Sequence, residues 1–151
     1  MWFEGKYAAV DTELQSVKEK LDVYGNTFFD DICGMTPLQY RDYVQKVYEQ
    51  KLHAIDADAT ISIATRTLAH SNLSMNYASA LFGFKNNIAM APMVVGKKGV
   101  RRADLSIDTL SYFKPLEQLP ILHSKNQRYY SFLADFTSSF CRQYMAADPL
   151  L

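Results

Sequence analysis

The residues with the most evident binding chemistry are four cations that lie close together after residue 95. Lys97 and Lys98 stand between Gly96 and Gly99, and Arg101 and Arg102 follow after one valine. Glycine lets a backbone approach a phosphate closely, while lysine and arginine neutralise its charge. The pattern would therefore suit contacts with the nucleic-acid backbone or with an acidic protein face. A solvated charged turn is the alternative, and the segment lacks the spacing of a phosphate-cradling loop.

A second group with conceivable chemistry comprises Glu49, His53 and Asp56, which lie four and three residues apart. On a helix these spacings place the side chains on one face, where they could ligate a metal if another element supplied more ligands. Acids and a histidine on an exposed helical face are more commonly just solvated. We therefore predict no metal site and no cofactor.

A nucleophile–base pair is not indicated either. No spacing links His70 or His123 to Cys33 or Cys141. A cysteine nucleophile needs a base within hydrogen-bond reach or an electropositive surrounding. Cys33 precedes a predicted helix instead of occupying its first turn, and Cys141 stands among aromatic residues, as a small core residue does. We predict that the protein is not an enzyme.

The clearest structural signal is a helix start at Thr36-Pro37-Leu38-Gln39. Threonine suits the N-cap, proline suits the first helical position, and glutamine three residues after the cap can return the hydrogen bond. A helix is predicted over 37–56. Its apolar stripe consists of Tyr40, Tyr43, Val44, Val47, Tyr48, Leu52 and Ile55.

The first segment repeats apolar residues at heptad spacing, which predicts an amphipathic helix over 5–24. Three heptads are near the lower limit for a coiled coil, so two interpretations stay open. The helix either packs in its own bundle or forms a seam with another chain. In the second case the partner interface would be Tyr7, Val10, Leu14, Val17 and Leu21.

No glycine or proline occurs from Leu38 to Phe82, and a single helix of that length would be about 67 Å long at ~1.5 Å per residue. A compact domain of this size cannot cover it, so a break is expected near residue 57, with Asp56 or Asp58 as the new cap. The next helix is predicted over 58–82. It is rich in small side chains, which allow close packing, although Thr60 to Ile63 alternate as in a strand.

The remaining segments complete the prediction of an all-α helical bundle of about five helices in one domain, 1–151. Residues 91–102 are expected to form a basic loop or short hairpin, because valines flank the two glycines. Short and terminal helices are predicted over 104–113 and 125–147. The terminal helix has an aromatic stripe that is typical of a core.

Composition excludes several classes of protein. The chain has 151 residues, 48% hydrophobic and 21% charged, which is typical of a globular domain. Only two cysteines occur, which favours a reducing compartment, and no apolar run reaches the length of a signal peptide core or a membrane span. We expect the protein to be cytoplasmic or to lie within an assembled particle.

Charge is unevenly distributed, although the net charge is zero. Residues 1–58 contain eleven acids and six bases, whereas residues 59–151 contain five acids and ten bases. Such asymmetry can steer a partner or another copy of the chain. The features that suit interaction outnumber those that suit catalysis. We therefore predict a non-enzymatic structural or adaptor subunit of a larger assembly, such as a virion, whose partners are other subunits or copies of itself. The alternative is a small nucleic-acid-binding protein that uses Lys97, Lys98, Arg101 and Arg102.

Overall fold

The computed structural model describes residues 8–99, 101, 105–119, 134, 137 and 138. All regular elements among these residues are helical, and no strand occurs in them, so the predicted all-α class is confirmed. The chain divides into two compact units, 1–121 and 122–151, and the helices described below belong to the first. The single domain over 1–151 stays a prediction, and the predicted terminal helix lies outside the described residues except for its residues 134, 137 and 138.

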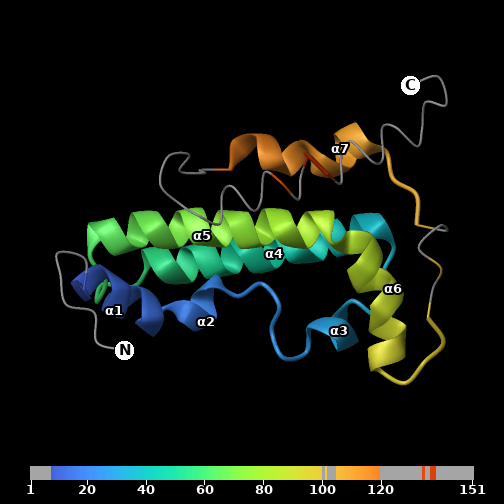
Figure 1. Cartoon of the computed structure of the whole chain (residues 1–151), viewed down its shortest axis with the longest axis horizontal. Helices are drawn as coiled ribbons and strands as arrows, with labels where there is room; N and C mark the ends of the chain where they lie inside the picture. Colours follow the sequence, from blue (N-terminus) through green and yellow to red (C-terminus); the bar gives the residue numbers. More distant parts are fainter. Residues whose placement is uncertain (1–7, 100, 102–104, 120–133, 135–136, 139–151) are drawn as a thin grey trace. The chain divides into compact units, whose positions relative to one another are not determined.

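Two helices of 20 residues, α4 (Pro37–Asp56) and α5 (Ile63–Phe82), lie side by side at the centre of the first unit (Figure 1). The predicted capping box is present, because Thr36 Oγ1 accepts from the Gln39 amide while the Gln39 side chain accepts from the Thr36 amide. The prediction of a helix over 37–56 is confirmed at both ends. Its buried residues are Tyr40, Val44, Tyr48 and Ile55.

The start of α5 differs from the prediction. Asp58 does not cap the helix, since its carboxylate accepts from the Thr60 amide and pairs with Lys20. Ser62 is the N-cap instead, and its hydroxyl accepts from the Thr65 amide. The helix therefore begins at Ile63, five residues later than expected. The small residues of α5 are buried, as close packing requires; they include Ala69, Ser71, Ser74, Ala78 and Ala80.

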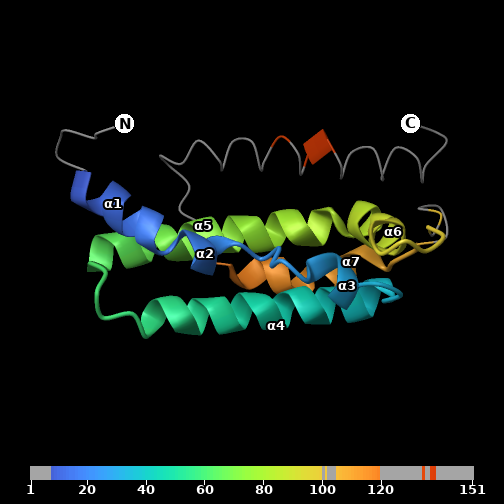
Figure 2. The ribbon, with the colours of Figure 1, turned by 90° about the horizontal axis from the view of Figure 1, so that it is seen from below.

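The predicted continuous helix over 5–24 is wrong. Two short helices, α1 (Ala8–Ser16) and α2 (Lys18–Leu21), are separated at Val17. The Ser16 hydroxyl donates to the Glu13 carbonyl at 2.7 Å and so competes with the backbone at this point. The break lets Val17 and Leu21 enter the core beside α4 and α5. A third short helix, α3 (Phe28–Asp31), follows, and all three lie along one side of the α4–α5 pair (Figures 1 and 2).

Glu13 fastens α1 to the start of α5. Its carboxylate accepts hydrogen bonds from the Ser62 amide and hydroxyl, at 2.8 and 2.7 Å, and from the Thr65 hydroxyl. The Thr65 bond, followed by the two Ser62 bonds, lowers the pKa of Glu13, because all three favour the charged form. The carboxylate also stands at the positive N-terminal end of α5. A contact 49 residues apart in sequence thus completes a helix cap.

The loop predicted over 91–102 begins later than expected, because residues 91–94 belong to α6, whereas residues 95–99 and 101 contain no helix or strand. This helix, α6 (Phe84–Val94), follows α5 directly after Gly83 and turns away from it (Figure 1). Its buried face consists of Phe84, Ile88, Ala89, Ala91 and Pro92, and the helix packs on α3 and α4. Tyr40 secures the junction, since its hydroxyl donates to the Ala80 carbonyl at 2.9 Å and accepts from Asn87 at 2.8 Å.

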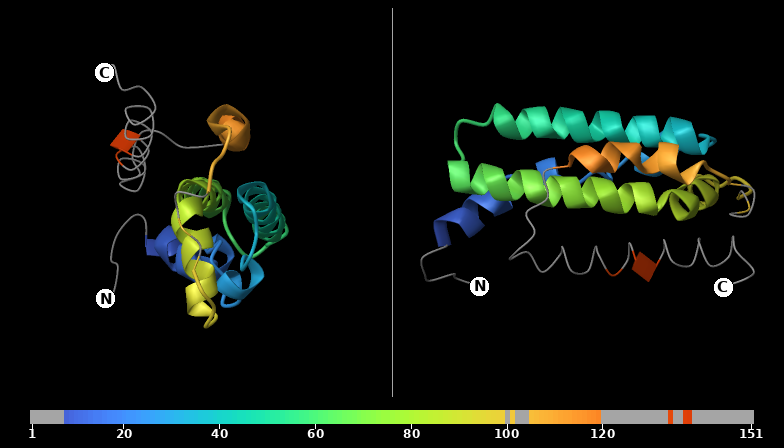
Figure 3. Two further views of the ribbon diagram at one scale, coloured as in Figure 1. Left: turned by 90° about the vertical axis from the view of Figure 1, so that its right-hand side faces the viewer. Right: turned by 90° about the horizontal axis from the view of Figure 1, so that it is seen from above.

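The helix predicted over 104–113 begins later than expected. It forms α7 (Thr109–Phe113), which continues as the 3-10 helix η2 (Lys114–Gln118) with Pro115 in its first turn. Phe113 stacks on Phe82 with ring centroids 4.7 Å apart, and buried Tyr112 lies 4.8 Å from the Phe84 ring. These aromatic contacts hold α7 over the seam between α4 and α5 (Figure 3). Of the helices described, none has the length and apolar character needed to cross a membrane.

Candidate functional site

The predicted basic loop is positioned by the C-terminal end of α6. Gly96 has φ of +74°, its amide donates to the Met93 carbonyl at 3.2 Å, and the Lys97 amide donates to the Pro92 carbonyl at 2.6 Å. This pair of bonds around a left-handed glycine is a Schellman motif, which satisfies carbonyls at the end of a helix. Gly96 therefore ends α6. The sequence analysis had instead interpreted this glycine as one that lets the backbone approach a phosphate.

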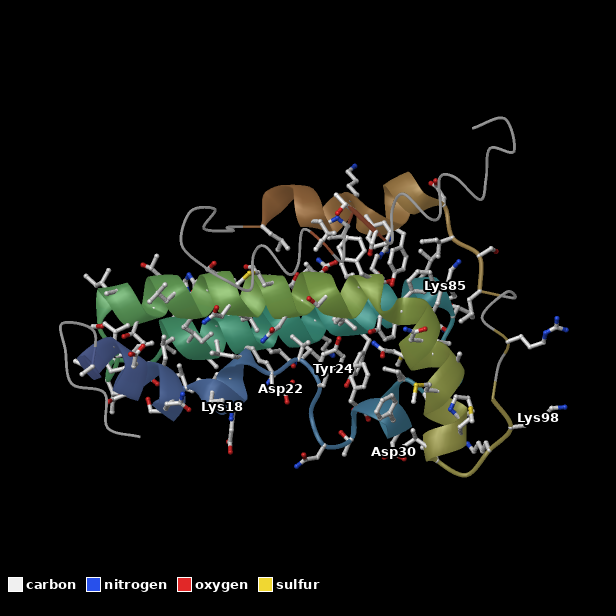
Figure 4. All side chains as sticks on the ribbon, in the orientation of Figure 1. Lys18, Asp22, Tyr24, Asp30, Lys85 and Lys98 are labelled. Carbon is white, nitrogen blue, oxygen red and sulfur yellow. The ribbon has the colours of Figure 1, made fainter. Side chains whose placement is uncertain are left out.

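The cations of this segment are accessible. Lys97, Lys98 and Arg101 are exposed, and none of them forms an ion pair within the described residues, whereas Arg102 lies outside those residues. Figure 4 shows Lys98 extending away from the chain that follows α6. Positive charge at this place also suits the negative end of the α6 dipole. The described residues thus include three exposed cations in the segment that follows α6.

An apolar face, which the sequence analysis missed, adjoins the cations. Met90, Met93 and Val94 have exposed fractions of 46%, 66% and 56%, and their spacing places them on one side of α6. Gly99 lies over this face, since a Cβ there would be 2.9 Å from the Met93 Cγ atom. We call the combined region the α6-end surface. It consists of Met90, Met93, Val94, Lys97, Lys98 and Arg101.

The residues of the predicted N-terminal interface are placed differently from one another. Val17 and Leu21 are buried in the core of this chain, and Asn76 donates to the Leu21 carbonyl at 2.6 Å. Leu14 packs partly buried against the same core, and Val10 is half-buried. Tyr7 lies outside the described residues. The interface with another chain stays a prediction, but two of its residues already pack within this one.

The acids and histidine on α4 do not act as a group. His53 is exposed, Glu49 accepts from Gln45 at 3.0 Å, and Asp56 pairs with His70 on α5 at 2.8 Å. In the described part of the chain, no cluster of three or more possible metal ligands is found. Asp56 and His70 instead join the end of α4 to α5.

Three exposed acids, which we call the acidic side, lie along the α2–α3 segment, which also carries the exposed Lys18; the α3 end of this segment packs against α6. Glu19, Asp22 and Asp30 are exposed, and none of the ion pairs within the described residues involves them. Helix α3 packs against α6, so negative and positive surfaces adjoin on one molecule. Figure 4 shows Asp22 and Asp30 on the α2–α3 segment and Lys98 after α6.

Comparison with known proteins gives no further guidance. No family model, curated protein or solved structure matches the chain.

Proposed function

We propose that this protein is a non-enzymatic structural subunit that assembles with copies of itself. In the contact, the α6-end surface of one copy faces the acidic side of another. The observation that carries the proposal is the exposure of Met93 and Val94, at 66% and 56%, beside unpaired lysines. Exposed apolar side chains that are grouped and rimmed by charge are typical of interaction sites, and methionine adapts well to a partner surface.

The chemistry of the surface favours a protein partner. Phosphates need cations but offer nothing apolar to cover three exposed hydrophobic side chains, whereas a protein face can supply both carboxylates and apolar contacts. A helix that lies on a membrane carries cations along its whole polar face, whereas α6 itself contains a single lysine, Lys85, and the cations of the α6-end surface follow its last residue. A partner with an acidic and partly apolar face therefore fits best.

A second copy of the chain supplies such a face. The acidic side adjoins the α6-end surface, and Tyr24, which is 39% exposed, adds an apolar group beside Asp22. When complementary surfaces adjoin on one molecule, two copies related by a two-fold axis can exchange both contacts at once. The opposite charges of the two halves of the chain would also steer the encounter.

Sedimentation of the purified chain over a concentration series tests this proposal. We expect mass to rise with concentration at about 0.05 M salt and less steeply at about 0.5 M, where surface charges are screened. Lys98→Glu should weaken association, and mixing it with an Asp30→Lys variant should restore it. Lys46→Glu, at an exposed lysine on α4, is the matched control and should have no effect.

Two outcomes would contradict self-assembly. One is a monomer at every concentration and salt. The other is binding of duplex nucleic acid, with a binding constant that decreases as salt is added. If the slope of its logarithm against the logarithm of the salt concentration falls by about 0.9 for each lysine removed, the alternative function is favoured.

A further inference from the structure

A pocket that the proposed assembly does not use lies between α4, α5 and the α7–η2 segment. Its volume is about 530 Å³, within the range of sites that bind small molecules. Helix α7 lies over the seam of the α4–α5 pair, so three elements form the walls (Figure 3). The charged or polar residues of its lining include Arg41, Gln45, Glu49, His70, Tyr77, Ser111 and Lys114.

Hydrogen-bond donors gather at one end of this pocket. The Arg41 guanidinium lies 3.5 Å from the Ser111 carbonyl, and Lys114 follows Ser111 by one turn. Lys114 is exposed and has no ion-pair partner within the described residues. Glu49 stands two turns further along α4, about 12 Å from Arg41 at ~1.5 Å per residue, where it accepts from Gln45. Because Arg41 pairs with the adjacent Asp42 at 2.7 Å, the unpaired positive charge at this end comes from Lys114.

The second observation is a buried hydroxyl with no hydrogen-bond partner. Tyr77 lines the pocket, is only 1% exposed, and its phenolic oxygen has no partner in the part of the chain that the structure describes. An unsatisfied buried hydroxyl costs about 1–3 kcal/mol, so folds seldom keep one without a reason. Burial raises the pKa of Tyr77 to about 12, which keeps the hydroxyl protonated and able to donate.

One wall in the middle of the pocket is apolar, beside the polar side chains of Gln45 and Glu49 on α4. The Tyr48 ring stacks on the Tyr77 ring at 4.6 Å, and Leu52 continues this wall along α4. Pro115 and Leu119 of the η2 segment complete the lining on the other side. An elongated apolar body would therefore lie between the end at Lys114 and the far end of the pocket.

We propose that this pocket binds a small amphipathic acid, whose anionic head group lies among Arg41, Lys114 and the Tyr77 hydroxyl while its apolar body lies along Tyr48 and Leu52. The hydroxyl oxygen is covered in this structure, so the head group must displace neighbouring side-chain atoms to reach it. Among the described residues, the Arg41 side chain forms hydrogen bonds only to the adjacent Asp42 and, at 3.5 Å, to the Ser111 carbonyl, so it can reorient toward the head group.

Calorimetric titration with decanoate tests this site, and decyl phosphate distinguishes a carboxylate head group from a phosphate. Decylammonium, with the same chain and the opposite charge, is the control ligand. We expect decanoate or decyl phosphate to bind and decylammonium to bind at least about tenfold more weakly. Binding of neither anion, or equal binding of decylammonium, would overturn the proposal.

Variants separate this site from the fold and from the assembly surface. Tyr77→Phe should weaken binding of the anion by about tenfold while leaving resistance to urea unchanged or higher, because the hydroxyl has no partner to lose. Lys114→Gln should weaken binding to a similar extent. Lys98→Gln, which alters the α6-end surface only, should leave it unchanged. Full anion binding by both Tyr77→Phe and Lys114→Gln would overturn the proposed site.

Discussion

The two central helices begin in nearly the same way and yet depend on different parts of the chain. Thr36 before α4 and Ser62 before α5 both adopt extended backbone angles, and both accept from an amide three residues later. At α4 the returning group is Gln39, inside the first turn. At α5 no side chain of the first turn returns the bond to the Ser62 amide, and Glu13 takes that place from α1.

The difference separates a local cap from a tertiary one. The α4 cap depends only on the order of four residues, so it forms whenever that helix forms. The α5 cap is complete only when α1 is docked, so its stability and the docking of α1 are coupled. The first residue of α4 can thus be predicted from the local sequence, whereas that of α5, a helix of equal length, cannot.

The largest effect is expected from Ser62→Ala. The substitution removes the bond to the Thr65 amide and one of the bonds to Glu13, so unfolding in urea should show a loss of about 2 kcal/mol, near the upper end for an N-cap. The loss should shrink when Glu13 is already Gln, since the two residues share one network. Ser79→Ala, at an exposed serine of the same helix, is the control. If the stability losses of Ser62→Ala and Glu13→Gln simply add in the double variant, the α5 cap does not depend on Glu13 and does not differ from the α4 cap in this respect.

A smaller effect is expected from Thr36→Ala, at about 1 kcal/mol. Here the loss should be the same whether position 13 is Glu or Gln, because no residue of α1 contributes to this cap. Thr36→Ser keeps the hydroxyl and should retain most of the stability. An unchanged unfolding curve for Thr36→Ala would contradict a helix start at this residue.

The smallest effect at neutral pH is expected from the charge of Glu13, and it should become visible in acid. Its pKa is lowered in the fold, so the stabilisation is fully present above its ordinary value near 4.5 and is lost as the pH falls through the lower, folded-state value. Urea unfolding between about pH 6 and pH 3 should show this loss, with Asp58 contributing in the same direction. The Glu13→Gln variant should lose less stability over the same range. An identical pH dependence in both proteins would mean that the carboxylate does not hold α1.

Features that depend on neighbouring residues were predicted from the sequence, and features that depend on tertiary contacts were missed. Helix α4 was predicted at both ends, because capping box and apolar stripe are local patterns. The start of α5 was missed, since Asp58 and Ser62 both suit a cap and only the contacts of Lys20 and Glu13 decide between them. The break at Val17 was missed for a related reason: the heptad pattern continues across it.

The candidate sites were predicted only in part. The cations after α6 were identified from their spacing, but the adjoining methionines were not, because Val94 and Val95 beside a glycine resemble a strand end. Phe84, Ile88, Ala91 and Pro92 follow a helical spacing that could have revealed α6 and its outer face. The pocket could not have been found, since Arg41, Tyr77 and Lys114 come from three elements that meet only in the folded chain.

The contact between Glu13 and Ser62 also imposes an order in time on a growing chain. The four residues of the α4 cap leave the ribosome together, whereas Glu13 emerges 49 residues before Ser62. At about 5–20 residues per second, that interval is roughly 2–10 seconds, far longer than the microseconds in which a short helix forms and melts. During those seconds α1 has neither the α5 cap nor the α5 surface to dock on. Helix α1 is therefore synthesised well before the contact that stabilises it can form.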